Sequence, residues 1–441
     1  MLSLDAIRLL AELTSFAPRS SSRPRQLAWA YSLVWLSDIV SWAMPPLNPF
    51  VWGRPIDDPS KIVGMDGFAR EVALMLKGRT NVALFGPRDT GKTTFTSQLA
   101  LELGRSHGPD APPHAVIRIN LQRAFSIAAF NACVHDALAS HPERHIRREA
   151  RKQLSALEKE IGFDIKVIKG AVRRTGVTTG QDAEALHAQL KALSKLAGDV
   201  VVVFDEFQVL RRCPDNPLAI IRSALMSAGS NHVSLLLTGS IRDALKLMLE
   251  NSEQPIFNEA AELQLPRISR AEFFEFLEFN FDATGKPISE QALEHLLSVT
   301  DCHPMRTQQL AWGAWQRAKP GVATEVDDID AVQQSLLEGR DGAAFEATMA
   351  MLLNGDDADA NEARALFLLA DRGPQRLTGR QNVALYGFTN ASMIVPALER
   401  SRRRGLTEQR AGQWTVVDPL FATWLRKKSP LALRAADLPG E

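Results

Sequence analysis

The chain has 441 residues with 51 lysines and arginines against 51 aspartates and glutamates, so its formal net charge is zero. A neutral total excludes a protein that is drawn to nucleic acid or to a membrane by its overall charge. With 45% hydrophobic residues it has the composition of a soluble globular protein, and its length predicts roughly two or three domains.

Residues 1–45 precede any recognisable motif. Within them, residues 27–44 read LAWAYSLVWLSDIVSWAM and are apolar and rich in tryptophan. A membrane span is one interpretation, but Asp38 lies in the run, and a carboxylate in mid-membrane is costly. The small-residue cleavage site of a secretory signal is missing too. We expect a poorly ordered or helical extension outside the globular fold, with a peripheral or partner-binding helix as the alternative.

The first chemical motif is NVALFGPRDTGKTTFTSQLA at residues 81–100. Its glycines, lysine and threonine have the spacing G-x-x-x-x-G-K-[ST] of a phosphate-binding loop, between an apolar run and a helical pattern. Backbone N–H groups in such a loop, and the helix N-terminus behind it, attract a phosphate. We expect Lys92 to reach the β- and γ-phosphates and Thr93 to hold Mg²⁺. The predicted nucleotide-binding residues in this motif are Gly86, Pro87, Arg88, Asp89, Thr90, Gly91, Lys92, Thr93 and Thr94.

A second strand is predicted from Ala115 to Leu121, and a long, mainly helical segment follows it. Residues 200–208 then read VVVVFDEFQ, and such an unbroken apolar run is typical of a central strand in a parallel sheet. Asp205 and Glu206 stand at its carboxyl end, where ligands bind in open α/β sheets. We expect Asp205 to bind the Mg²⁺ through water and Glu206 to polarise the attacking water.

Two further strands complete the predicted sheet, from His232 to Thr238 and from Glu262 to Leu265. Ser240 follows the first of them and is the preferred sensor of the γ-phosphate or of the attacking water, with Thr238 as a second choice. A simple strand-ending turn is the alternative for both. The pattern predicts a three-layer α/β P-loop domain with a parallel sheet over residues 46–267.

These motifs resemble those of the archaeal-type ATPases, a family in the signal-transduction branch of the AAA+ class, and of their bacterial relatives in particular. The likeness extends from Asn48 to Lys428 and is carried by GPRDTGKTTF, FDEFQ, LLLTGS and DPLFATWL. The resemblance implies an ATP- and Mg²⁺-dependent ATPase in which Lys92, Glu206 and Ser240 are catalytic. It also implies a leading segment that wraps the adenine (Asn48 to Phe50 with Gly53, then Gly64 to Glu71 and a short helix), a helical lid and a C-terminal winged helix.

Two positions depart from the family pattern. Gly64 is followed by Met65 and Asp66, where the family commonly has arginine and glutamate. Asn258 and Glu259 stand where many relatives have an arginine. Such an arginine can accelerate hydrolysis by orders of magnitude, so we expect slow turnover, or turnover that needs an arginine from a partner.

The predicted lid covers residues 268–352. A capping-box pattern from Ser269 to Glu272 opens its first helix, Ser289 caps the second, and Pro304 begins the third. A further helix ends near Leu337. Arg306, early in the third helix, is either a second nucleotide-sensing arginine or a solvated one.

Residues 353–360, LNGDDADA, are predicted to be a linker before a winged helix over residues 361–428 and a tail over 429–441. Helices are expected over 361–371, 378–386 and 392–404, and then two strands around a turn at Ala411 and Gly412. The third helix ends in Arg400, Arg402, Arg403 and Arg404, a local excess of positive charge that suits contact with DNA phosphates. Winged helices also serve as protein-binding modules, so a protein target is the alternative.

The leading functional hypothesis is an ATP-driven molecular switch coupled to a winged helix that binds DNA or a protein. The alternative is a nucleotide-stabilised scaffold with little ATPase activity.

Cys133, Cys213 and Cys302 have neither metal spacing nor an even count, which predicts thiols in the reducing cytoplasm. The sequence is compatible with a homo-oligomer, and we expect no membrane partner.

Overall fold

The computed structural model describes residues 46–104, 114–161, 180–196, 198–213, 217–225, 232–240, 260–375 and 377–429. The predictions made for residues 1–45, for Asn258 and Glu259, and for the tail beyond Ser429 lie outside these ranges. None of the helices within them combines the length and the apolar character needed to cross a membrane.

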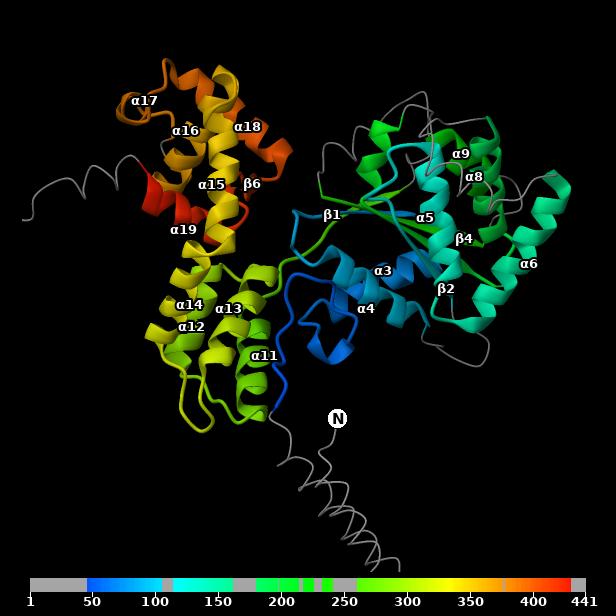
Figure 1. Cartoon of the computed structure of the whole chain (residues 1–441), viewed down its shortest axis with the longest axis horizontal. Helices are drawn as coiled ribbons and strands as arrows, with labels where there is room; N and C mark the ends of the chain where they lie inside the picture. Colours follow the sequence, from blue (N-terminus) through cyan, green and yellow to red (C-terminus); the bar gives the residue numbers. More distant parts are fainter. Residues whose placement is uncertain are drawn as a thin grey trace, which may run out of the picture. The chain divides into compact units, whose positions relative to one another are not determined.

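A five-stranded parallel sheet forms the centre of the first domain (Figure 1). The strand order is β2-β3-β4-β1-β5, and all four strand pairings are parallel. The strands are β1 (Val82–Phe85), β2 (Ala115–Asn120), β3 (Val200–Asp205), β4 (Val233–Gly239) and β5 (Ala261–Gln264). β2, β4 and β5 each begin and end within one residue of their predicted bounds, and β3 begins at Val200 as predicted and ends at Asp205, within the stretch 200–208. Because β1 lies beside β4, and β4 beside β3, the carboxyl ends of these strands meet at one edge.

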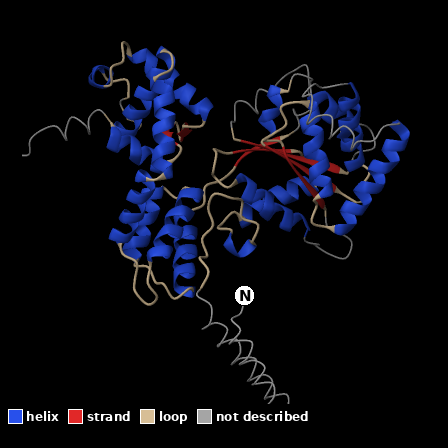
Figure 2. Cartoon of the chain, viewed as in Figure 1, coloured by secondary structure: helices blue, strands red, loops and turns tan. Residues whose placement is uncertain are grey.

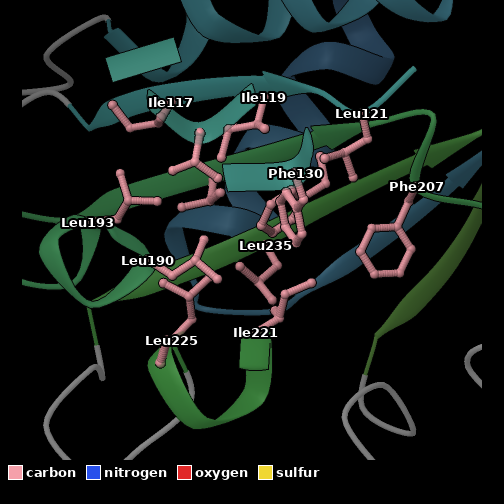
Figure 3. Close-up of a cluster of buried hydrophobic side chains, with 14 of the residues drawn as sticks. Ile117, Ile119, Leu121, Phe130, Leu190, Leu193, Phe207, Ile221, Leu225 and Leu235 are labelled. Carbon is pink, nitrogen blue, oxygen red and sulfur yellow. The ribbon is translucent and has the colours of Figure 1, made fainter. Parts of the chain in front are cut away.

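Helices cover both faces of this sheet (Figures 1 and 2). Successive residues of β3 point to opposite faces, so Val202 and Phe204 join one buried cluster and Val201 and Val203 join another. Figure 3 shows the first cluster, in which Phe130, Leu190 and Ile221 pack near strand residues. Its helices are α5 (Ile127–Ala139), α6 (Arg144–Ile161), α8 (Gly180–Leu193) and α9 (Pro217–Leu225), and those of the second face are α3 (Asp66–Lys77) and α4 (Lys92–Gly104). The predicted three-layer architecture is confirmed.

The lid consists of α11 (Arg270–Ala283), α12 (Glu290–Thr300), α13 (Pro304–Arg317) and α14 (Val326–Glu338). The capping box at Ser269 and Glu272 and the cap at Ser289 are present as predicted. Apolar residues at helical spacing on α11, such as Leu277 and Phe281, form its buried core. Phe50 of the leading segment joins that core, with its ring centroid 5.1 Å from that of Phe281.

The N-cap of α13 is a buried histidine, His303, whose protonation state affects the stability of the fold. His303 is 2% exposed, and its Nδ1 accepts a hydrogen bond from the backbone N–H of Arg306 at 3.5 Å. Burial lowers the pKa of His303 from 6.5 to about 4, with Asp418 opposing and Arg306 reinforcing the shift. A protonated Nδ1 could not accept this bond, so the neutral ring belongs to the folded state.

We therefore expect acid to destabilise the lid through His303. Because its folded pKa is depressed, the stabilisation is present in full above about pH 6.5 and is lost as the pH falls through about 4. The free energy of unfolding should drop by up to about 3 kcal/mol over this window. His303→Asn keeps a capping acceptor without the titration, so its urea-unfolding curves should depend less on pH. Equal pH dependence of the two proteins would contradict the assignment.

The C-terminal module follows the order of elements expected of a winged helix. It contains α15 (Arg340–Leu353), α16 (Asp357–Arg372), α17 (Arg380–Leu385), α18 (Ile394–Arg404), β6 (Thr407–Arg410), β7 (Gln413–Val416) and α19 (Pro419–Lys428), with a 3-10 turn, η3 (Ala391–Met393), before α18. The antiparallel strands β6 and β7 are joined by Ala411 and Gly412. These two residues have φ angles of 46° and 78°, as a two-residue hairpin turn with the twist of its strands requires.

Two boundaries differ from prediction. α16 begins at Asp357, inside the segment predicted as a linker, because Asp356 caps it and acidic residues in a first turn complement the helix dipole. α15, which fell within the predicted lid, shares its buried core with the C-terminal module. Met349 and Leu352 belong to that core, and the ring centroid of Phe345 lies 5.0 Å from that of Phe421.

Candidate nucleotide site

The loop at residues 86–91 joins the end of β1 to the start of α4 in a tight turn. Gly91 and Asp89 have φ angles of 92° and 61°, in the left-handed region. A Cβ at Gly86 would lie 3.2 Å from the hydroxyl oxygen of Thr90 and 3.3 Å from Leu265 Cβ, so this position leaves little room for a side chain. The loop therefore has the close backbone path at a helix N-terminus that anion binding requires.

Lys92, the first residue of α4 after this loop, is buried, with 5% of its surface exposed. Its ammonium donates hydrogen bonds to the carbonyl oxygens of Gly86, at 2.9 Å, and Pro87, at 2.6 Å. Burial lowers the pKa of Lys92, and Glu206, Asp205 and Asp89 oppose that shift. The structure thus brings a cation from the loop toward the carboxylates of the central strand.

Thr93 and Asp205 meet at the same point although they are 112 residues apart. The Thr93 hydroxyl donates to Asp205 Oδ2 at 3.0 Å. The other carboxylate oxygen accepts from the Thr238 hydroxyl and from the backbone N–H of Glu206, the latter at 3.1 Å. A hydroxyl and a carboxylate at one place are oxygen donors of the kind that Mg²⁺ prefers, so these residues fit that ion.

Mg²⁺ usually keeps several waters and takes few protein ligands. The ranges that the structure describes contain no group of three or more His, Cys, Asp or Glu residues that could hold a metal ion. Thr238 contacts Asp205 directly, so its position is that of an orienting residue for this carboxylate.

Glu206 occupies a left-handed backbone position directly after β3, with φ 58° and ψ 41°. For a residue with a Cβ this conformation costs roughly 1 to 2 kcal/mol, and such strain gathers at functional sites. Its Oε2 accepts a hydrogen bond from the Ser240 hydroxyl at 3.0 Å and another from the Gln208 amide. The same amide donates to Ser240 Oγ at 2.9 Å.

Sequence reasoning placed Ser240 near the reaction but missed Gln208. The only signal was a polar residue two places after the carboxylate. The short helix η2 (Phe207–Arg212) turns the chain back at this point and brings the Gln208 amide to Glu206 and Ser240. The three side chains thereby form one hydrogen-bonded group at the carboxyl edge of the sheet.

Hydrogen bonds join the leading segment to α4. The Thr94 hydroxyl accepts from the backbone N–H of Ile56 at 3.2 Å, and the Ser97 hydroxyl donates to Asp57 at 2.8 Å. Arg118, within β2, donates to the same Ser97 hydroxyl at 2.8 Å. Thr94, predicted to bind nucleotide, therefore contacts the segment that the family resemblance assigns to the adenine.

A cavity of about 1260 Å³ opens beside the phosphate-binding loop. Its lining includes the loop from Arg88 to Thr94, the leading segment with Trp52 and Ile62, the start of α13 with Arg306 and the start of α15 with Asp341. Glu206 also lines it. The cavity exceeds the usual range for small-molecule sites, so it has room for a nucleotide.

Arg306 is buried, with 7% of its side chain exposed. Its Nε donates to both carboxylate oxygens of Asp418, at 2.9 and 3.0 Å, and Nη1 donates to Asp341 at 2.7 Å. Burial acts to lower the pKa of Arg306, but the two aspartates raise it overall, so the guanidinium is charged. The solvated alternative for Arg306 is wrong, and neither of its acidic partners was foreseen.

The arginines predicted to contact DNA differ in their surroundings. Arg400 donates to the carbonyl oxygen of Ala358 at 2.9 Å, Arg402 donates to Glu399 at 3.0 Å, and Arg404 pairs with Glu362 at 3.2 Å. Arg403 is exposed. The acidic start of α16, which lies before the range predicted for the winged helix, supplies part of this pairing, since Arg404 also contacts Asp359.

The strand order, the loop and the paired carboxylates define a P-loop fold of the AAA+ type. The sequence matches no family model, and no curated protein matches it. A Walker-type ATPase of Pyrococcus abyssi has the same fold, with a TM-score of 0.62 and 18% identity over 85% of this chain and 99% of that one. The ORC2 protein of Aeropyrum pernix, in its ADPNP and ADP complexes, has a TM-score of 0.53 and 15% identity over 86% and 97%. The predicted fold is thereby confirmed.

Proposed function

We propose that this protein is an ATPase related to the archaeal-type family and that it uses ATP as a molecular switch acting on its C-terminal module. The observation that carries the proposal is the meeting of Lys92, Thr93, Asp205 and Glu206 from two separate segments beside one cavity. The similar folds of a Walker-type ATPase and of a protein in ADPNP and ADP complexes support it.

The chemistry follows from these positions. Mg²⁺, when bound, neutralises charge on the β- and γ-phosphate oxygens. Thr93 and Asp205 would hold it, and Lys92 would exchange its carbonyl partners for phosphate oxygens, which make stronger charge-assisted bonds. Glu206 accepts a proton from the water that attacks the γ-phosphorus, which yields ADP and inorganic phosphate. Ser240 and Gln208 hold the Glu206 carboxylate in place for this step.

The C-terminal module is proposed to be a winged helix that contacts DNA through the end of α18. Arg403 and Arg404 are exposed there, Arg404 being paired with acidic side chains of α16, and Arg426, Lys427 and Lys428 lie in the last turn of α19. One observation favours a second candidate, the scaffold that acts through protein contacts: Arg400, Arg402 and Arg404 are already engaged within the module.

Comparing ATP turnover with and without duplex DNA separates the two candidates. A switch on DNA predicts turnover that duplex DNA changes several-fold. A scaffold predicts bound ATP, negligible phosphate release and no effect of DNA.

Arg403→Ala is the sharpest single test of the DNA contact. We expect weaker binding to every duplex sequence and a salt dependence reduced by about one phosphate contact. Arg404→Ala is less suitable, because it leaves the buried Glu362 without its cation. Arg317→Ala, at the exposed end of α13, is the matched control. If Arg403→Ala and the parent bind DNA equally over a salt titration, this surface is not the interface.

A further inference from the structure

Three separate parts of the chain meet at the Arg306 guanidinium. Arg306 itself is in the first turn of α13, Asp341 is in the first turn of α15, and Asp418 is the N-cap of α19. Gln309 completes the group, since its side-chain oxygen accepts from Arg306 Nη1 at 2.5 Å and its amide donates to Asp341 at 2.9 Å. Arg306 and Asp341 also line the cavity that contains Lys92 and Thr93.

This group has an excess of negative charge. One arginine faces two aspartates, so one negative charge is left over beside the cavity. Arg306 is 7% exposed, and Asp341 and Asp418 are 25% and 24% exposed. Removing the guanidinium from between two partly buried carboxylates would leave them facing each other without a cation, which is strongly unfavourable. The position of Asp418 is therefore tied to that of Arg306.

Asp418 also controls the start of α19. Its Oδ1 accepts hydrogen bonds from the backbone N–H groups of Leu420, at 2.9 Å, and Phe421, at 3.4 Å. Phe421 belongs to the buried core of the C-terminal module, and α19 packs against α16 there. A change of partner at Arg306 thus acts directly on an element of that core.

We propose that Asp418 is a positioning residue that withholds Arg306 from the nucleotide, so that the γ-phosphate of ATP competes with Asp418 for the guanidinium. The inference rests on the proposed function of the site. A phosphate binds a guanidinium as readily as a carboxylate does, and in the same bidentate geometry. ADP has no γ-phosphate and competes less. Asp418 thereby lowers the preference for ATP over ADP and links that preference to the C-terminal module.

Asp418→Asn tests this in the full-length protein with Mg²⁺. Asparagine keeps the size of the side chain and its capping oxygen but loses the charge that holds Arg306. We expect the ratio of ATP affinity to ADP affinity to rise about tenfold, which corresponds to one lost ionic partner. Titration calorimetry with each nucleotide measures the ratio.

A second ionic bridge provides the matched control. Arg267 joins Asp301 of the lid, at 3.2 Å, to Glu408 of β6, at 3.0 Å. None of these three residues is among those that line the nucleotide cavity. Glu408→Gln therefore removes a bridge of similar chemistry and should leave the affinity ratio unchanged.

The double variant Asp418→Asn, Arg306→Gln shows whether the effect passes through Arg306. In the Arg306→Gln background, the replacement of Asp418 should no longer raise the ratio. In the parent, amide exchange in the first turn of α19 should be faster with a non-hydrolysable ATP analogue than with ADP.

The outcomes separate this inference from the proposed function. Nucleotide binding with the same ratio in Asp418→Asn and the parent overturns the inference alone. An equal rise in Glu408→Gln does so as well, because it would indicate general loosening of the C-terminal module. A parent protein that binds neither ATP nor ADP overturns the proposed function and the inference together.

Discussion

Lys92→Ala is expected to reduce the affinity for ATP by roughly a hundredfold or more, because the variant loses a charge-assisted contact that a buried side chain makes to phosphate. The Lys92 ammonium already bonds two backbone oxygens of the preceding loop, so it is placed to exchange them for phosphate oxygens without rearrangement of α4. Equilibrium titration with a fluorescent ATP analogue measures the effect.

The variant also removes a buried cation that interacts electrostatically with three carboxylates, so its folding has to be checked separately. Thermal unfolding without nucleotide shows whether the fold is kept. Lys319→Ala, at an exposed position between α13 and α14, should bind ATP as the parent does. A folded Lys92→Ala protein with parental affinity would refute the nucleotide site.

Glu206→Gln is expected to keep ATP binding and to lose turnover by about two to four orders of magnitude, since the amide cannot accept a proton from water. The substitution preserves shape and an oxygen that can accept from Ser240. Phosphate release under single-turnover conditions isolates the chemical step from product release. Equal rates for Glu206→Gln and the parent would rule out Glu206 as the general base.

The two variants are informative as a pair. Loss of binding in one and loss of turnover in the other is the pattern of a hydrolysing switch. A scaffold gives a different pattern. The parent binds ATP without measurable phosphate release, and Glu206→Gln behaves in the same way. In that case Glu206 would take no part in catalysis. Its strained backbone and its bonds to Ser240 and Gln208 would only stabilise the turn that follows β3.

Much of the fold could be predicted because its signals are local. Alternating faces and unbroken apolar runs specify strands, while Ser269 with Glu272 and Ser289 specify helix starts through bonds to residues three positions away. The start of α16 was wrong for a related reason. Its cap, Asp356, stands in a polar stretch that also has the composition of a linker.

The sequence by itself determined the loop with the spacing of a phosphate-binding motif, the parallel sheet that presents Asp205 and Glu206, and the order of elements in the C-terminal module. Each depends on spacing, periodicity or capping within a few residues. Only the tertiary structure decided which side chains meet: Gln208 with Ser240, Arg404 with Glu362, and Arg306 with Asp418, 112 residues further along the chain. A charged residue has the same local signature in solvent as in a buried pair, and the approach of distant segments decides between the two.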